Sequence, residues 1–351
     1  MPNGLKVLGR NVFNGCASLK SIEIPQGVTV IQAYTFANCQ ALTSVEILNG
    51  VTMIGDHAFY NCASLKSIII PNTVTSMGNY SFANCTSLES MTLPFIGSAI
   101  SGEGKTHFGY IFGANDYSGQ KSYVPTSLKT VIITVGGKIA DYAFYNCSSI
   151  TNISIPDTVE YVGNSAFSGC SVTYTTYENC KYLGNENNNY VVLVQAIDKT
   201  AAEFTIHANT KVIAGRAFME CTELTRITIP EGVTSIGKVA FRYCTKLKEI
   251  DIPNSVVSIG EYAFGDCEAL ENVTIGSGVV TIGKGAFSTC EALKNVIISS
   301  SVKTIEEYAF FNSVITNVYY TGTSSQWYSI NIKDSNEPLE SASITFNYVI
   351  E

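Results

Sequence analysis

Hydrophobic residues recur along the chain with a period of 23 residues, and phenylalanine marks this period most clearly. The phenylalanines form three runs, and within each run the spacing is 23 without exception. The eleven positions, called the Phe column below, are Phe13, Phe36, Phe59, Phe82, Phe144, Phe167, Phe218, Phe241, Phe264, Phe287 and Phe310. Self-similarity at a fixed period of this length is the signature of a repeat architecture. The pattern therefore predicts stacked copies of one structural unit.

Each repeat contains two stretches that read as short strands. In "LKEIDIP", Ile250 and Ile252 alternate with polar residues, which predicts a strand with both isoleucines on its buried side. Pro253 has no N–H to donate to a sheet and is expected to end this strand. The following "VTSIG" predicts a second, shorter extended segment. The segment "AFRYC" at 240–244 is too short for a stable helix, and we expect a single helical or 3₁₀ turn there.

One such unit cannot bury its apolar face alone, whereas stacked copies bury their Val, Ile, Phe, Cys and Leu positions in continuous columns. We therefore expect a β-rich α/β repeat fold, a solenoid of 23-residue repeats. Where strands of successive turns pair, the rise is about 4.8 Å per turn. The expected solenoid spans residues 1–320, and residues 321–351, which include the single tryptophan Trp327, are expected to form a C-terminal cap.

Ten of the eleven cysteines lie three residues after a phenylalanine of the Phe column. This Cys column comprises Cys16, Cys39, Cys62, Cys85, Cys147, Cys170, Cys221, Cys244, Cys267 and Cys290. Equivalent thiols in one column offer no distinct disulfide pairs, and the Cys-x-x-Cys spacing typical of zinc sites is absent. Free cysteine behaves as a small buried hydrophobe. We expect nearly all thiols to be buried and reduced, and we interpret Cys180, outside the column, as a free thiol in a loop.

Two interruptions break the period and predict inserts near 95–127 and 173–203. The first is rich in Gly, Ser and Tyr, whereas the second contains an Asn-rich turn before "YVVLVQ" and predicts a hairpin. Long insertions in solenoids project from one edge and often carry binding. A solvated bulge without a partner is the alternative that the sequence leaves open.

The first repeat begins in its middle, because Pro2 aligns with Pro25 and the strand that should precede it is missing. We therefore expect the chain to be a fragment of a longer protein. The chain is acidic, with a net charge of -8 and only 14% charged residues. It has no cluster of Lys and Arg for nucleic acid or an anionic membrane, so we expect no nucleic-acid partner. No apolar run approaches the roughly 20 residues of a membrane helix, so we expect no membrane insertion.

The repeat "LTRITIPEGVTSIGKVAFRYCTK", which starts at Leu224, resembles the BspA-type leucine-rich repeat. The resemblance covers nearly the whole chain and rests on the Pro, Ala-Phe and Cys columns. It implies a right-handed leucine-rich-repeat solenoid. It also implies an extracellular or cell-surface protein of gut and mucosal microbes that adheres to host matrix proteins or to other cells. The sequence lacks the asparagine ladder that follows the strand in ordinary leucine-rich repeats.

Catalytic chemistry is not indicated by any motif. The three histidines, His57, His107 and His207, are spread along the chain without acidic partners at metal-ligand spacing. His57 occupies a position that other repeats give to tyrosine, and we interpret it as a surface substitution. There is no nucleophile elbow, phosphate-binding loop or acidic metal loop. We therefore expect no enzyme activity, no cofactor and no metal site.

The exposed positions of the longer strands are the first candidate binding site. Small polar residues with flanking long side chains suit a surface that docks another macromolecule, although a merely solvated sheet face explains them equally well. The candidate residues are Glu23, Glu46, Arg226, Thr228, Lys248, Asp251, Asn272 and Thr274. Tyrosines of the two inserts are the second candidate, as contact residues or sugar-stacking rings. They are Tyr110, Tyr117, Tyr123 and Tyr190.

From these features we expect a monomeric, non-catalytic adhesion or protein-interaction module. Its expected partner is a host extracellular matrix protein, cell-surface protein or glycan. The alternative is a structural spacer or stalk that presents another domain and binds no ligand of its own.

Overall fold

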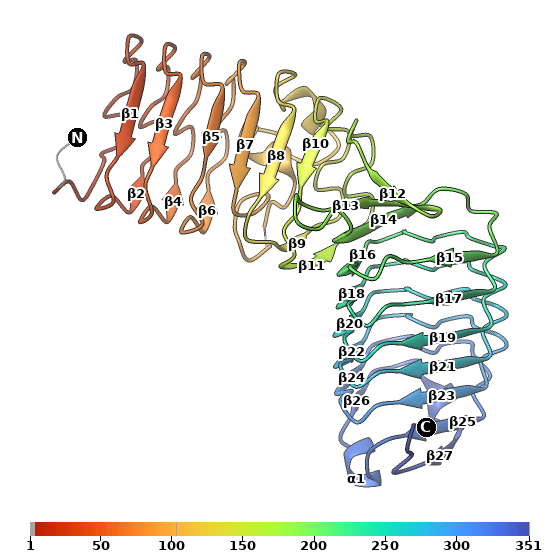
Figure 1. Ribbon diagram of the computed structural model, residues 1–351. Helices are drawn as coiled ribbons and strands as arrows, with labels where there is room; N and C mark the ends of the chain where they lie inside the picture. The colour runs from red at the N-terminus through yellow and green to blue at the C-terminus, as the bar shows by residue number, and fades with distance from the viewer. Residues whose placement is uncertain (1–3, 103, 351) are drawn as a thin grey trace. The chain divides into compact units, whose positions relative to one another are not determined.

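The computed structural model describes residues 4–102 and 104–350, and it divides into two compact units. Unit 1 comprises residues 1–159, 165–173 and 184–186, and unit 2 comprises residues 160–164, 174–183 and 187–351. Within each unit, successive coils of the chain stack on one another (Figure 1). The solenoid of roughly 23-residue repeats predicted from the Phe column is thus confirmed. Pro2, on which the expectation of an incomplete first repeat rests, lies outside the described residues.

Unit 1 carries one longer strand per coil, and these strands pair in parallel. They are β1 (Ser21–Ile24), β3 (Ser44–Ile47), β5 (Ser67–Ile69), β7 (Ser90–Leu93), β8 (Thr130–Ile133) and β10 (Asn152–Ser154). The register is offset by one repeat, as in Ser67 opposite Ser90. Shorter strands form further pairs between coils, namely β2 (Val30–Ile31), β4 (Met53–Ile54) and β6 (Ser76–Met77). The remaining elements here are the 3₁₀ helices η1 (Phe108–Phe112) and η2 (Gln120–Ser122), and strand β9 (Gly137–Ile139). Strand β11 (Val159–Val162) contains residues of both units.

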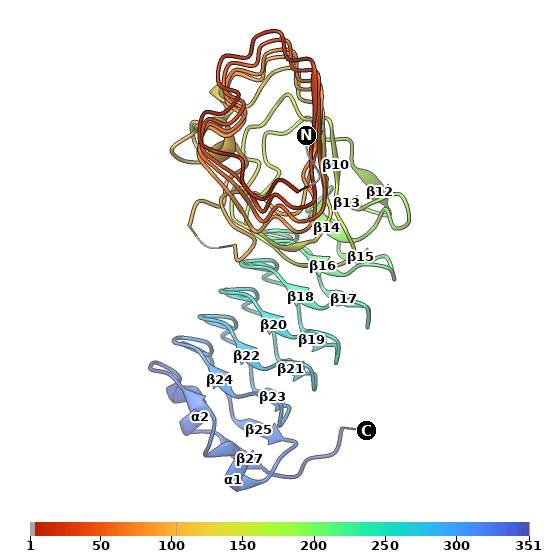
Figure 2. The same ribbon diagram turned by 90° about the vertical axis from the view of Figure 1, so that its left-hand side faces the viewer.

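Unit 2 repeats this plan with seven longer and six shorter strands (Figure 2). The longer ones are β15 (Glu203–Thr205), β17 (Arg226–Thr228), β19 (Glu249–Ile252), β21 (Asn272–Ile275), β23 (Asn295–Ile298), β25 (Asn317–Tyr320) and β27 (Ser343–Thr345). The shorter ones are β16 (Val212–Ile213), β18 (Ser235–Ile236), β20 (Ser258–Ile259), β22 (Thr281–Ile282), β24 (Thr304–Ile305) and β26 (Asn331–Ile332).

The second interruption of the period forms an antiparallel arrangement that leads into unit 2. Strand β12 (Thr175–Tyr177) pairs with β13 (Cys180–Leu183), which pairs across the Asn-rich turn with β14 (Val192–Ala196). Strand β14 then pairs in parallel with β16 and so joins the ladder of shorter strands. Cys180 and Tyr182 of β13 are fully buried in the core of unit 2. The interpretation of Cys180 as a loop thiol was therefore wrong, because the isolated sequence gave no sign of the strand that buries it.

The tail adds one further strand to each ladder of unit 2. Strand β26 pairs with β24, and β27 pairs with β25. The short helix α1 (Ser324–Trp327) precedes β26, and the short helix α2 (Glu337–Glu340) lies between β26 and β27. Trp327 and Leu339, one from each helix, are buried against the core, and Trp327 lies edge-on to Tyr320 at 5.2 Å.

The segment around each Phe forms a series of tight turns, so the expected single helical or 3₁₀ turn was wrong. Its N–H groups alternate between two kinds of partner. The Phe59 N–H donates to Ser81 O of the next coil at 2.8 Å, whereas the Cys62 N–H donates back to Phe59 O at 3.3 Å. This alternation requires left-handed residues such as His57 (φ 56°) and Asn61 (φ 58°) on both sides of the phenylalanine. The hydrogen bonds between coils offset the unfavourable energy of these positive φ angles.

The Phe and Cys columns stack as predicted. The structure adds a hydrogen bond from the cysteines that the sequence did not reveal. Neighbouring rings such as Phe241 and Phe264 lie parallel at 4.9 Å. Most of the column thiols also donate to the carbonyl of a phenylalanine in the preceding coil, as Cys267 Sγ does to Phe241 O at 3.3 Å. In the last repeat Ser313 replaces the cysteine and donates to Phe287 O at 3.2 Å. The column therefore selects a small side chain that can donate a hydrogen bond.

Candidate binding surfaces

The structure brings six of the eight predicted face residues together on neighbouring coils of unit 2. Arg226 and Thr228 lie in β17, Lys248 and Asp251 lie just before and within β19, and Asn272 and Thr274 lie in β21. They alternate with buried residues such as Ile227 and Ile250, because successive side chains of a strand point to opposite faces. Five of the six are exposed and Thr274 is half-buried.

Glu23 and Glu46, the other two predicted residues, lie in unit 1. They are opposite each other on β1 and β3, and both are exposed. Like charges directly opposite one another on a sheet destabilise it. The fold therefore gives no structural reason for this pair of carboxylates.

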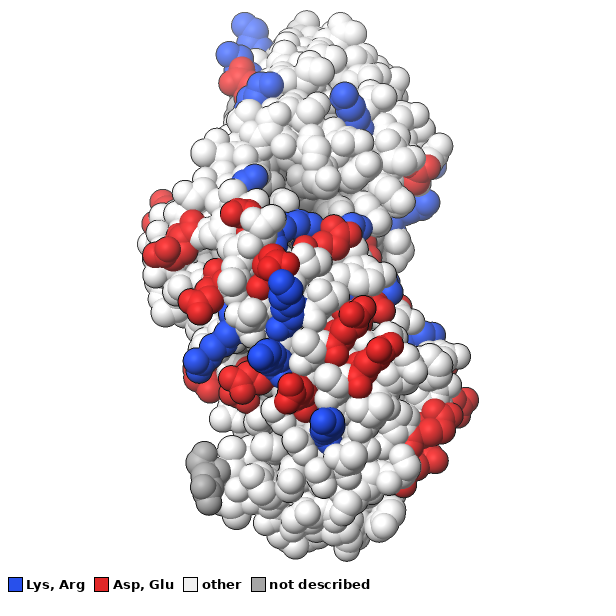
Figure 3. All heavy atoms as spheres, turned by 90° about the vertical axis from the view of Figure 1, so that its right-hand side faces the viewer, with Lys and Arg blue, Asp and Glu red and all other residues white. Residues whose placement is uncertain are grey.

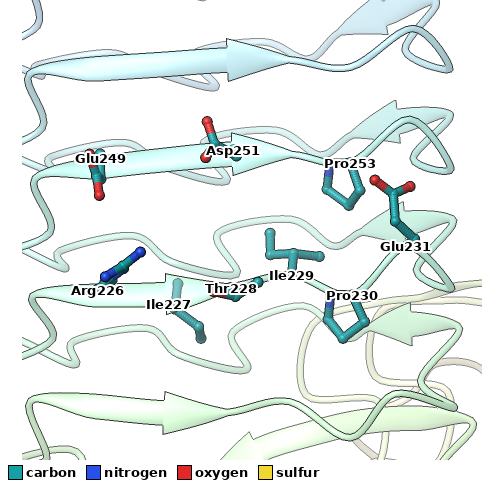
Figure 4. Close-up of a pocket in the computed structure, with 9 residues that line it drawn as sticks. All are labelled: Arg226, Ile227, Thr228, Ile229, Pro230, Glu231, Glu249, Asp251 and Pro253. Atoms are coloured by element: carbon teal, nitrogen blue, oxygen red, sulfur yellow. The ribbon is translucent and has the colours of Figure 1, made fainter. Parts of the chain in front are cut away.

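A hollow of about 320 Å³ lies at the exposed face of β17 and β19. Arg226, Glu249 and Asp251 project from these two strands, and Glu231 follows β17 in the turn after Pro230 (Figure 4). Pro230 and Pro253 form the apolar end of the hollow, where both strands end. Prediction from the sequence included Arg226 and Asp251 but missed Glu231 and Glu249. Both are charged residues close to the exposed strand positions, so the sequence alone could have identified them.

A second hollow, of about 630 Å³, occupies the equivalent position in unit 1. Its lining is uncharged and includes Asn49, Asn72, Thr92 and Thr134. Ile69 in β5 also lines it, and 66% of this side chain is exposed. An isoleucine at a position that neighbouring repeats give to Glu46 and Thr92 was a recognisable signal that the candidate set omitted.

The four insert tyrosines do not form one site. Tyr117 stacks on Tyr142 at 4.4 Å, and Tyr190 in unit 2 stacks on His207 at 3.6 Å. Tyr110 is half-buried, and burial raises the pKa of its hydroxyl. Tyr123 is 43% exposed and has no ring partner among the described residues. Of the four, Tyr123 offers the most accessible ring for a ligand, and Tyr190 is largely engaged in packing.

Elsewhere on unit 2, opposite charges on successive coils form ion pairs. Arg242 pairs with Asp266 at 2.7 Å, and Lys284 pairs with Glu307 at 2.8 Å. Hydrogen bonding to Glu307 raises the pKa of Lys284, and the same contact lowers the pKa of Glu307. Acidic and basic side chains lie intermingled on the face shown in Figure 3. Such a surface has no large field of one sign that would favour a polyanion.

Burial shifts the pKa of His57 and the pKa values of the buried column thiols in opposite directions. Burial lowers the pKa of His57, which lies half-buried between the rings of Tyr34 and Tyr80 rather than on the open surface that we had expected. Burial also raises the pKa of the column thiols, to about 11 for Cys39 and about 12 for Cys85. The thiolate is the reactive form of cysteine, so these residues are poor nucleophiles.

Two further observations concern metals and membranes. Within residues 4–102 and 104–350, no group of three or more His, Cys, Asp and Glu side chains is placed to hold a metal ion. No helix in the same ranges has the length and apolar character needed to cross a bilayer.

The chain was compared with solved structures and with curated proteins. Several solved structures are similar. One is a leucine-rich cell surface protein from Faecalibacterium prausnitzii, with 27% identity, 89% of this chain and 90% of that chain covered, and a TM-score of 0.45. Another is a leucine-rich repeat protein from Bacteroides ovatus, with 24% identity, coverage of 99% and 82%, and a TM-score of 0.34. A leucine-rich repeat protein from Eubacterium ventriosum has 24% identity, coverage of 87% and 84%, and a TM-score of 0.41. A search of curated proteins found no match.

The family comparison is more extensive. Six copies of the BspA type leucine rich repeat region match residues 2–103, 118–191 and 201–336, which together are most of the chain. These ranges contain the Pro, Ala-Phe and Cys columns on which the resemblance rested. The chain therefore belongs to the family of BspA-type leucine-rich-repeat proteins.

Proposed function

We propose that this chain is a non-catalytic interaction module of an extracellular or cell-surface protein, and that it binds a host or cell-surface macromolecule. The observation that carries the proposal is the exposed strand face of unit 2. There, Arg226, Glu249 and Asp251 surround a hollow without pairing with one another. A strand face that served only for solubility would not need charged groups held apart around a hollow.

Membership of a family of surface proteins supports the proposed location. The raised pKa values of the buried thiols, which disfavour the reactive thiolate, support a role without catalysis. Rigid stacked coils also suit recognition, because a preorganised surface loses little conformational entropy on binding.

The test is a binding screen of the chain against immobilised extracellular matrix proteins and host glycans. Beside the wild type, the screen uses Arg226→Ala, Lys248→Ala and Asp251→Ala combined in one variant. The matched control combines Lys303→Ala, Lys333→Ala and Glu291→Ala, which changes the net charge equally. We expect a partner whose affinity falls at least fivefold with the face variant, which is about 1 kcal/mol, and is unchanged with the control.

A third variant separates the inserts from the strand face. Tyr123→Ala removes the most accessible insert ring without disturbing a ring stack. Loss of binding with Tyr123→Ala alone would move the site to the first insert. Absence of any partner across the panel would overturn the proposal and favour a spacer that presents another domain.

A further inference from the structure

We propose that the hollow on β17 and β19 receives a lysine or arginine side chain of a partner polypeptide. This inference rests on the proposed function and specifies the chemistry of the partner. It is argued from the charges around the hollow, from their lack of internal partners and from the shape of its apolar end.

The charges around the hollow do not balance. Its lining contains the carboxylates of Glu231, Glu249 and Asp251 and a single guanidinium, that of Arg226. Arg226 is flanked along the ladder by Glu249 on β19 and by Glu203, its register partner on β15. Glu231 projects at the other end, beside Pro253, and Asp251 lies midway along β19; Arg226 is the one basic residue in the lining (Figure 4). That end therefore favours a cation.

These four charged groups are also left without partners inside the protein. Among the described residues, none of the four side chains makes an ion pair or a side-chain hydrogen bond. Five ion pairs do form elsewhere in unit 2, all of them between adjacent coils, such as Lys246 with Glu223 at 2.6 Å. The coil spacing thus permits pairing, yet the groups around the hollow remain available to a ligand.

The apolar end of the hollow fits the stem of a long basic side chain. Pro230 and Pro253 present their rings beside Asp251 and Glu231 (Figure 4). Lysine and arginine pack their methylene stems on apolar surface while the charged head makes hydrogen bonds. A head group placed beside Glu231 at this end would form charge-assisted hydrogen bonds, which are stronger than neutral ones. The equivalent hollow of unit 1 has an uncharged lining and lacks this feature.

The test measures the affinity of a fluorescently labelled nonapeptide of alternating glycine and arginine by anisotropy at about 50 mM salt. A glycine–glutamate peptide of equal length is the negative probe. The variant Glu231→Gln with Asp251→Asn removes the two uncompensated charges. The control, Glu268→Gln with Glu291→Gln, removes two exposed carboxylates elsewhere on unit 2 and changes the net charge equally.

We expect the hollow variant to weaken binding of the arginine peptide about fivefold, since two partly exposed ion pairs are worth up to about 1 kcal/mol each. The control should bind as the wild type does. Equal weakening in both double variants would show attraction by net charge alone and would overturn the inference, as would failure of the arginine peptide to bind. If that peptide fails while a matrix protein still binds through the strand face, the proposed function stands and only this inference is lost.

Discussion

At the scale of single residues, the Cys column shows how a repeat fold uses a chemically reactive side chain as a packing element. Nine of the eleven cysteines are buried, whereas Cys16 is exposed and Cys170 is half-buried. Cys16 belongs to the first described coil, so only one neighbouring coil covers it. Burial is therefore complete for nine cysteines, partial for Cys170 and lost at Cys16.

This difference predicts the labelling pattern of the native protein. A maleimide or similar thiol reagent should modify Cys16 rapidly and Cys170 slowly. The other nine should react only after unfolding, because burial both blocks access and raises their pKa values, to about 12 for Cys290. Mass spectrometry of peptides after timed labelling would identify the modified sites. Rapid modification of Cys267 or Cys290 in the native state would contradict the burial of the inner thiols of the Cys column.

His57 predicts a pH dependence of stability that the equivalent tyrosines do not share. Its ring lies between Tyr34 and Tyr80 at 4.6 and 4.8 Å, and its Nδ1 is buried without a hydrogen-bond partner in the described part of the chain. Burial lowers its pKa below the ordinary value of 6.5, and nearby Asp56 opposes this shift only in part. As the pH falls below about 6.5, the unfolded chain gains a proton before the folded one does. The free energy of unfolding must then decrease.

The measurement is thermal unfolding of the wild type and of His57→Tyr at pH 7.5 and pH 5.5. We expect the wild type to lose more stability between the two values, because tyrosine does not titrate in this range. His107, whose pKa burial also lowers, is present in both proteins and its contribution cancels. An equal loss of stability in the two proteins would show that the position between Tyr34 and Tyr80 does not disfavour the protonated form of His57.

At the scale of elements, the turn around each phenylalanine depends on residues that accept a positive φ. Asn61 has φ 58° and its amide donates to Asn38 Oδ1 at 2.9 Å, which forms a short asparagine ladder in unit 1. Asn295 makes the same kind of bond to Asn272 Oδ1 at the start of the longer strands. The sequence lacks the ordinary ladder after the strand, but the fold builds amide ladders at these other positions.

We therefore expect Asn61→Ala to destabilise unit 1 by about 2 kcal/mol. Alanine loses the amide hydrogen bond and also strains the left-handed backbone, by roughly 1 kcal/mol each. Asn61→Gly loses the hydrogen bond but adopts the positive φ freely. Urea unfolding followed by circular dichroism should thus rank glycine above alanine by about 1 kcal/mol. Equal stabilities would mean that the turn does not constrain this residue.

Prediction from the sequence worked where one residue type recurs at one position and failed where a conformation is shared by different residues. The Phe and Cys columns predicted the stacked coils because periodic apolar residues have few other ways to be buried. The left-handed positions before the phenylalanine hold residues as different as Tyr34 and Val239, so no residue type marked them. Two residues after it, recurring Asn and Gly such as Asn61 were a signal that the prediction did not use. For the binding face, alternation identified exposed positions such as Arg226 and Asp251. The alternation could not identify the hollow, because its lining also includes Glu231, which lies in the turn after Pro230.

At the scale of the whole molecule, the two units use one coil geometry to display different surface chemistry. Both have a hollow where the longer strands end, lined by Ile69, Asn72 and Thr134 in unit 1 and by Arg226, Glu249 and Asp251 in unit 2. The buried columns fix the backbone in both units, so the exposed strand positions are free to vary. This separation lets one repeat scaffold present surfaces of different chemistry.

The same architecture makes the cost of a core mutation depend on its place in the stack. In a solenoid each repeat contacts only its neighbours, so an inner residue has two packing partners and an end residue has one. Phe59 is fully buried between Phe36 and Phe82 at 5.3 and 5.2 Å. Phe13 is half-buried and stacks on Phe36 alone at 5.4 Å. These are the same residue in the same column, and they differ only in position.

We expect Phe59→Ala to destabilise unit 1 by about 3–5 kcal/mol, as for a fully buried phenylalanine, and Phe13→Ala by about 1–2 kcal/mol. The single tryptophan lies in unit 2, so amide hydrogen exchange across β3 and β5 is a suitable measurement for unit 1. Phe59→Leu, which keeps most of the apolar volume, should recover more than half of the loss and so exclude a failure to fold. Similar costs at Phe13 and Phe59 would show that unit 1 unfolds as one block rather than as a stack of coupled neighbours. Unequal costs would show instead that stability is built up coil by coil.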